Sequence, residues 1–231
     1  MKILKSFQFI VILAVSYLMA FSSCKKNSDS TPPPSGGTLG MHLHTNVDTS
    51  EVNNYGDTFL IKKCDTCSAN TRRIVVTKAQ MYISGIQLVK SDGSTAAATG
   101  TVLQMQDMEA YTVGAVASGN YVSIKFNAAI DDFEGSIDTS ASGSSGNLVP
   151  FKFKFGTSGR TVSMGNHQTQ FNSVIGISPN SIGYVHMMVD YAKLFTGIQL
   201  KDSARINITN PSDANAAAIA DNIHLMFEYE E

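Results

Sequence analysis

The feature that most constrains the fold is a two-residue alternation of apolar and polar side chains, which recurs along most of the chain. Successive side chains of a β-strand point to opposite faces, so this alternation is typical of strands that bury one face. The alternating runs are rich in β-branched and aromatic residues and are separated by Gly, Asn, Asp and Ser. They predict strands at residues 39–47, 58–61, 73–90 with a bend near Gly85, 101–105, 119–126, 151–155, 161–164, 183–191, 203–208 and 223–229.

These short strands predict an all-β domain, an antiparallel two-sheet sandwich that is immunoglobulin-like in general architecture. One or two short helices are expected beside the sheets. Residues 190–195 offer one or two helical turns, and residues 210–223 contain Ser212 as an N-cap followed by an alanine run. The segment 131–147 is acidic at first and then small and polar, which predicts a solvated loop, with a calcium site as the alternative.

The first 24 residues, 1–24, predict a lipoprotein signal peptide that is no part of the domain. Lys2 and Lys5 precede an apolar run at 9–20, which is short for a membrane span. The run ends in small residues at Cys24, which resembles a bacterial lipoprotein signal, where that cysteine becomes the lipidated first residue of the mature chain. The alternative is a plain secretory signal in which Cys24 has no role.

Residues 25–37 are rich in Ser, Pro and Gly and predict a flexible tether, because they are too polar to form a core. Residues 38–231 then form one domain, since about 190 residues are enough for a hydrophobic core. The start "CKKNSDS" is similar to the mature N-termini of Bacteroidetes lipoproteins. We therefore expect an outer-membrane lipoprotein, on either the periplasmic or the cell-surface face.

The nearly balanced charge gives no reason to expect a partner that binds mainly by charge. A formal net charge of -2 indicates neither a nucleic-acid-binding protein nor one that binds an anionic membrane by charge. Contact with the membrane is expected through the N-terminal lipid only.

Cys64 and Cys67 are the two cysteines of the domain, in the polar segment "KKCDTCSANTRR". An oxidising compartment favours a disulfide between them. Two alternatives remain, a reduced pair that serves as soft metal ligands and a redox-active pair. A thioredoxin-type pair would open a helix, whereas the next segment here is strand-like, and a structural zinc site would normally need a second pair.

The histidines predict a metal site. His42 and His44 would share one face of the first strand, and His186 and Met188 would share one face of a late strand. Imidazole with a thioether suits Cu(I), and imidazole alone suits Cu(II) or zinc. A joint site requires an imidazole nitrogen of His42 or His44 within a few ångströms of His186. The alternative is that the methionines fill the core and the histidines are ordinary polar residues.

Two further pairs of residues are weaker candidates. Asp48 and Glu51 would accept hydrogen bonds from the imidazoles and so orient them, or they are simply turn and rim residues. His224 with Met226 repeats the spacing of two residues in the last predicted strand, whereas His167 lies in a polar stretch and is expected in a loop.

Catalytic motifs are missing from the sequence. It has no G-x-S-x-G elbow, no G-x-G-x-x-G and no phosphate-binding loop, so no enzyme is expected. A hydrolase assembled from distant loops remains the alternative and would need a cleft that holds His, a carboxylate and Ser.

Several segments together resemble the MbnP-like copper-binding domain family found in Bacteroidetes lipoproteins. They are "HLHTNVDTSEV", "RRIVVTKAQMYISGIQLVKSDGS", "GNYVSIKFNAAID", "GYVHMMVDYAKLF" and "IADNIHLMFEY". The resemblance implies a secreted or lipid-anchored β-sandwich and copper ligation by the histidines of the first and fourth segments. The better-known members also use a tryptophan oxidised to kynurenine, and this chain has no tryptophan, so that ligand is not carried over.

The sequence therefore predicts a lipid-anchored, monomeric copper-binding protein of the cell envelope, which stores copper or hands it over without turnover. A copper transporter or a surface protein is the expected partner. The alternative is a surface-exposed β-sandwich interaction module that has lost the metal site.

Overall fold

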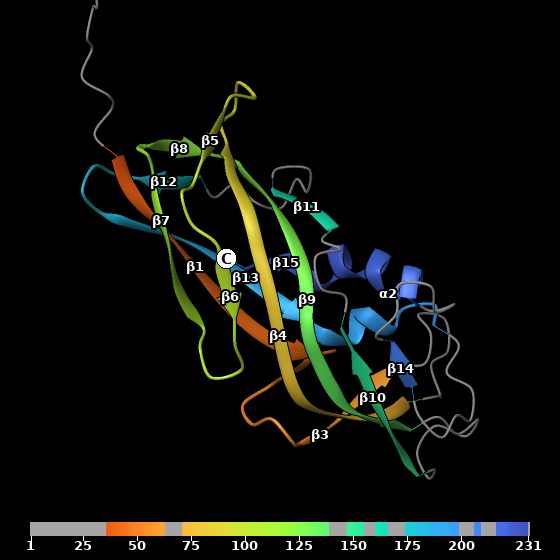
Figure 1. Ribbon diagram of the computed structural model, residues 1–231. Helices are drawn as coiled ribbons and strands as arrows, with labels where there is room; N and C mark the ends of the chain where they lie inside the picture. The colour runs from red at the N-terminus through yellow and green to blue at the C-terminus, as the bar shows by residue number, and fades with distance from the viewer. Residues whose placement is uncertain are drawn as a thin grey trace, which may run out of the picture. The chain divides into compact units, whose positions relative to one another are not determined.

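Two long antiparallel strands, β4 (Thr71–Val89) and β9 (Ser123–Asp138), form the middle of the larger sheet (Figure 1). The computed structural model describes residues 36–62, 71–138, 147–154, 160–165, 174–198, 206–208 and 216–230. The strands that extend the larger sheet are β3 (Thr58–Lys62), β5 (Thr95–Ala97), β6 (Val102–Gln104), β10 (Leu148–Phe153), β11 (Arg160–Gly165) and β14 (Ile206–Ile208).

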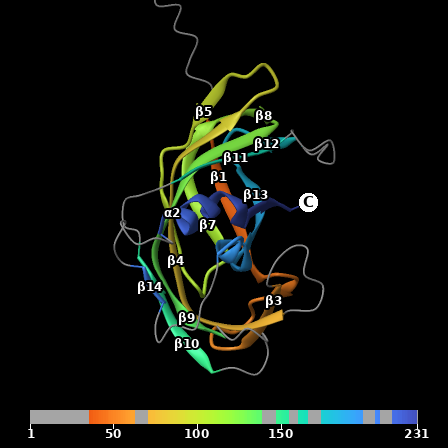
Figure 2. The ribbon, with the colours of Figure 1, turned by 90° about the vertical axis from the view of Figure 1, so that its right-hand side faces the viewer.

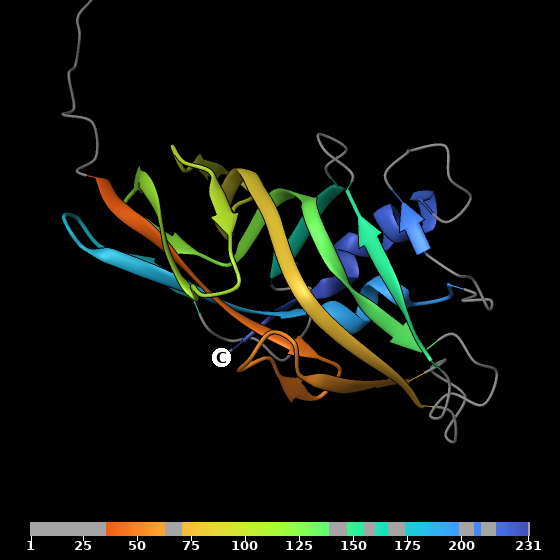
Figure 3. The same ribbon diagram turned by 60° about the horizontal axis from the view of Figure 1, so that its bottom comes forward.

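Strand β1 (Gly36–Val47) is the central strand of the second sheet. It pairs in parallel with β13 (Ile182–Asp190) and antiparallel with β7 (Ala110–Ala117). The remaining elements are β2 (Ser50–Glu51), β15 (Phe227–Tyr229), the pair β8 (Gly119–Tyr121) and β12 (Ile175–Ile177), the 3-10 helices η1 (Tyr191–Phe195) and η2 (Ile223–Met226), and α2 (Ala216–Asn222). The two main sheets lie face to face (Figures 2 and 3).

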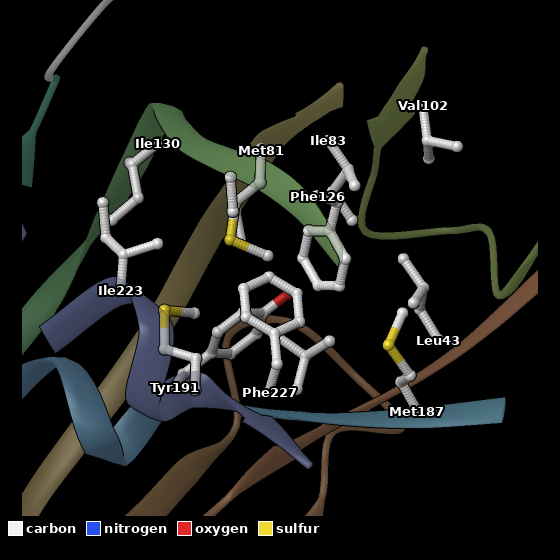
Figure 4. Close-up of a cluster of buried hydrophobic side chains, with 14 of the residues drawn as sticks. Leu43, Met81, Ile83, Val102, Phe126, Ile130, Met187, Tyr191, Ile223 and Phe227 are labelled. Atoms are coloured by element: carbon white, nitrogen blue, oxygen red, sulfur yellow. The ribbon is translucent and has the colours of Figure 1, made fainter. Parts of the chain in front are cut away.

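The hydrophobic core fills the space between the two sheets. Leu43 of β1 and Met187 of β13 are fully buried and lie together with Phe126 of β9 and Phe227 of β15 (Figure 4). Burial of one face of each sheet is the reason for the alternation seen in the sequence. The predicted all-β sandwich is therefore confirmed. Among the described strands, the pairs β1–β13 and β10–β14 are parallel. In these two pairs the structure departs from the predicted antiparallel arrangement.

Bulges change which residues of the long strands face the core. The pairing of β4 with β9 shifts between Val76 and Lys78, and again between Ser84 and Gln87. The inward residues are accordingly even-numbered up to Val76, odd-numbered from Ala79, and even-numbered again after the second shift. Gly85 has a φ of 60° at this second shift, so the bend predicted there is confirmed.

The predicted loop at 131–147 is partly wrong, because residues 131–138 belong to β9. Asp131 is the extra residue of a bulge, so the alternation of β9 is interrupted there and the strand could not be recognised from its pattern. Asp132 is buried and its Oδ2 accepts a hydrogen bond from Lys78 Nζ at 2.6 Å, which keeps an acidic residue inside a strand. Residues 139–146 lie outside the described residues.

Other strand predictions also need correction, since the short strands β2, β5 and β12 lie outside the predicted ranges. Strand β7 was not predicted, and the predicted strand at 223–229 is divided into η2 and the shorter β15. In η2 Met226 is buried and His224 is exposed, because a helical turn does not place residues two apart on the same face.

Several predictions fall outside the described residues and stay predictions. These concern the signal peptide and Cys24, the tether, the disulfide between Cys64 and Cys67, the loop with His167, and the N-cap Ser212. In the described part of the chain, no helix combines the length and the apolar character that crossing a membrane requires.

Candidate metal centre

The register of β1 against β13 puts the predicted ligands on one face. His42 is paired with His186, and His44 with Met188. Their chain neighbours Met41, Leu43, Val185 and Met187 are fully buried. Because side chains alternate along a strand, the histidines and Met188 therefore project from the outer face of the sheet, away from the core.

Three imidazoles are adjacent on this outer face. The ring centroids of His42 and His44 are 4.4 Å apart, and those of His42 and His186 are 5.1 Å apart. The first and the late strand thus bring their imidazoles side by side, as predicted, while the described residues whose ligand atoms lie within 4.8 Å of one another are His42, His44 and Glu109. The side chains of His42 and His44 are 25% and 31% exposed, so solvent reaches both rings.

Two carboxylates that the sequence did not single out contact these rings. Glu109 Oε2 lies 3.5 Å from His42 Nε2 and 3.9 Å from His44 Nε2, and Glu230 Oε2 lies 2.5 Å from His44 Nδ1. His42, His44 and Glu109 each offer a ligand atom, and these atoms lie within 4.8 Å of one another. An imidazole and carboxylate set of this size suits a transition-metal ion.

The backbone explains how these carboxylates reach the site. Glu109 directly precedes β7, and its carbonyl accepts a hydrogen bond from the Leu43 N–H at 2.8 Å. Glu230 directly follows β15, and its N–H donates to the His186 carbonyl at 3.0 Å. Both residues are therefore fixed to β1 or β13 by main-chain hydrogen bonds.

One nitrogen of His42 has no hydrogen-bond partner within the part of the chain that the structure describes. His42 Nδ1 is buried, and none of the described residues supplies a hydrogen-bond partner for it. A buried polar atom without a partner is unfavourable, so such an atom in a native protein calls for an explanation. Because Nε2 is the nitrogen that faces Glu109, a cation between these two residues would be bound by Nε2, and Nδ1 would stay without a partner from the described segments.

Met188 lies on the same face, but its sulfur already has a contact. The Asn46 side-chain amide, also on the outer face of β1, donates to Met188 Sδ at 2.8 Å. At the other end of the site the Tyr184 ring crosses β1 at Gly40, where an added Cβ would lie 2.5 Å from Tyr184 Cε1. Gly40 thus lets this ring approach β1, with its centroid 6.3 Å from that of His186.

Asp48 and Glu51 do not take the role predicted for them. Asp48 lies in the turn after β1, where its backbone N–H donates to Asp190 Oδ1 at 2.8 Å, and Glu51 is exposed on β2. In the described residues, neither carboxylate comes within 4.0 Å of His42 or His44, whereas Glu109 and Glu230 do. The prediction erred because nearness in sequence along an extended strand does not mean nearness in space.

Asp190 fixes the end of β13 against the turn after β1. It is buried, and its Oδ1 accepts hydrogen bonds from the N–H groups of Asp48 and Ala192. Burial raises the pKa of Asp190, although these two N–H groups favour its charged form. The β1 and β13 ends are therefore tied together beyond the histidines.

His224 is not part of this cluster. His224 is exposed on η2, with its Nδ1 2.5 Å from the carbonyl oxygen of Asp221, and His167 lies outside the described residues. His224 thus belongs to a local turn.

Comparisons with known proteins bear on the fold. No protein-family model matches the chain, and no curated protein matches its sequence. MbnP from Methylosinus trichosporium is a structural match with a TM-score of 0.52 and 11% sequence identity, and the match covers 84% of this chain and 98% of that one. At this identity the match shows that the chain has an MbnP-like fold.

Proposed function

We propose that this protein binds copper in the cell envelope, for storage or for hand-over to a partner, and that it does not turn over a substrate. The observation that carries the proposal is the convergence of His42, His44 and His186 on the outer face of the smaller sheet. The ligand atoms of His42, His44 and Glu109, which lie within 4.8 Å of one another, support it.

The choice of copper rests on two arguments. The first is the ligand chemistry, because imidazoles bind Cu(II) or zinc and a neighbouring thioether such as Met188 is a Cu(I) ligand. The second is the resemblance of the chain to the MbnP-like copper-binding domain family, together with its MbnP-like fold.

The same residues explain how the ion would enter and leave. The rings of His42 and His44 are partly exposed and His186 is exposed, so an ion is reached from the solvent side. An open site of this kind favours exchange with a second protein over permanent burial of the ion. We place the protein at the outer membrane, anchored by a lipid on Cys24, with a copper transporter or surface protein as its partner.

Copper uptake by the full-length chain, purified without a histidine tag, tests the proposal. Wild type is expected to bind about one copper per chain. His42→Ala, His44→Ala and His186→Ala should each lower the copper affinity by at least about 10- to 100-fold. Loss of a residue that only orients a ligand already costs this much, so loss of a ligand should cost no less. Isothermal titration and elemental analysis give the affinity and the stoichiometry, with zinc as a competing ion.

His224→Ala serves as the matched control, because it removes an exposed imidazole outside the cluster. If wild type takes up neither Cu(I) nor Cu(II) at micromolar free metal, the proposal fails and the interaction-module alternative takes its place. Metabolic labelling with a fatty acid, compared between wild type and Cys24→Ala, tests the anchor.

A further inference from the structure

We propose that Glu109 is a direct copper ligand, that Glu230 orients His44, and that together they make this centre selective for Cu(II) over Cu(I). The inference rests on the proposed function and adds to it the oxidation state of the bound ion. It comes from the position of the two carboxylates, neither of which the sequence indicated.

The contact between Glu230 and His44 decides which nitrogen of the His44 ring carries the lone pair that can bind a metal ion. Glu230 Oε2 lies 2.5 Å from His44 Nδ1 without the alignment of a hydrogen bond, and a carboxylate charge at this separation favours a proton, and not a lone pair, on Nδ1. The neutral ring then has its lone pair on Nε2, which is the nitrogen nearer to Glu109. Glu230 thus acts as a positioning residue that presents His44 Nε2 to an ion.

The separations around Glu109 are too long for hydrogen bonds and short enough for a shared ion. Glu109 Oε2 is 3.5 Å from His42 Nε2 and 3.9 Å from His44 Nε2, beyond the usual N–H···O range of about 2.7–3.2 Å. Two ligands on one metal ion are commonly about 3–4 Å apart, since each metal–ligand distance is about 2 Å. A carboxylate oxygen and two imidazole nitrogens therefore surround one point that a cation would occupy.

Charge and softness decide between the two copper ions. With neutral imidazoles, Glu109 and Glu230 bring two negative charges to the site, which complements a divalent ion better than a monovalent one. Carboxylate oxygen is a hard ligand, whereas Cu(I) prefers thiolate and thioether sulfur. Met188, the thioether paired with His44 across β1 and β13, has its sulfur in contact with the Asn46 amide.

The decisive experiment compares Glu109→Gln with Asp107→Asn in the full-length chain. Asp107 is exposed two residues before Glu109, so Asp107→Asn removes the same charge from the same loop but touches no imidazole. Competition with a Cu(II) chelator and, separately, with the Cu(I) chelator bicinchoninate gives the two affinities of each variant.

Glu109→Gln should lower the Cu(II) affinity about 10- to 100-fold and change the Cu(I) affinity less than about threefold. The Cu(II)/Cu(I) reduction potential of the bound ion should then rise by about 60 to 120 mV, since tenfold corresponds to about 59 mV for one electron. Glu230→Gln should lower the Cu(II) affinity by about tenfold, and Asp107→Asn should change neither affinity more than about threefold.

The outcomes separate this inference from the proposed function. If wild type binds copper and Glu109→Gln has the affinities of Asp107→Asn, Glu109 is no ligand and the inference is overturned while the proposed function stands. Equal losses of Cu(I) and Cu(II) affinity in Glu109→Gln would overturn the selectivity. If wild type binds no copper, both proposals are overturned.

Discussion

Asp132 shows how one residue can hold a charge inside a strand of this sandwich. The Lys78 ammonium lies 2.6 Å from Asp132 Oδ2, and the Lys152 ammonium lies 3.4 Å from Asp132 Oδ1. Burial alone would raise the pKa of Asp132, but the hydrogen bond from Lys78 and the charges of both lysines outweigh it. The pKa of Asp132 is therefore lowered in the folded state.

This lowered pKa makes the stability of the protein depend on pH in a defined direction. The charged carboxylate of Asp132 stabilises the fold above about pH 3.9, the ordinary pKa of aspartate, and the stabilisation is lost as the pH falls through the lower folded value. Asp132→Asn should lower the free energy of unfolding by about 1.5–3 kcal/mol at pH 7. The difference from wild type should shrink as the pH falls below about 4, as measured by urea unfolding across this range.

Asp57→Asn is the control, because Asp57 is exposed and has no ion pair within the described residues. Its effect should stay within about 0.5 kcal/mol. A difference between wild type and Asp132→Asn that is the same at pH 3 and pH 7 would contradict the role assigned to the Asp132 charge.

At the scale of the element, β1 separates stability from binding by its two faces. Leu43 faces the core and is fully buried, whereas His42 and His44 face outward and are partly exposed. The strand is thus both a central part of the core and the support of the candidate metal centre. Substitutions on the core face of β1 should lower stability and leave copper affinity nearly unchanged. Substitutions on its outer face should lower copper affinity and leave stability nearly unchanged.

Leu43→Ala should lower the free energy of unfolding by about 2.7–5 kcal/mol, because it removes buried methyl groups and leaves a cavity. Its copper affinity, measured where the variant is fully folded, should stay within about threefold of wild type. His44→Ala should do the opposite, with a loss of stability below about 1 kcal/mol and a large loss of affinity. Urea unfolding and titration of the same preparations measure both properties.

Leu43→Met is the conservative control and should cost less than about 1.5 kcal/mol. Loss of copper affinity in Leu43→Ala equal to that in His44→Ala would show that the two faces of β1 are not independent.

At the scale of the whole molecule, the site exists only when the sheet has formed. Its candidate residues come from β1, from the residue before β7, from β13 and from the residue after β15. These segments are far apart in the sequence, so an unfolded chain does not hold them together. An ion bound by them therefore binds the folded state and stabilises it.

Copper should thus raise the free energy of unfolding by about 2.7 kcal/mol when the free ion is 100 times its dissociation constant. Urea unfolding with and without Cu(II) measures this effect, and addition of a chelator should reverse it. The double variant His42→Ala, His44→Ala should show no stabilisation. If it is stabilised as much as wild type, copper binds elsewhere in the chain, for which the pair Cys64 and Cys67 is the first candidate.

The sequence alone was sufficient to predict most strands and the shared face of His42 and His44. Both depend on the alternation of side chains along a strand, which is a local and steric property. The pattern failed at Asp131, where a bulge interrupts it, and for β7, whose residues were not recognised as a strand.

Only the tertiary structure decided which residues meet at the candidate site. The parallel register of β1 and β13 pairs His42 with His186, and the ends of β7 and β15 bring Glu109 and Glu230 to the imidazoles. Strand order and register result from the packing of both sheets around one core, which is a non-local property of the chain. The sequence by itself determined the faces of the strands, and the packing of the sheets determined the neighbours on each face.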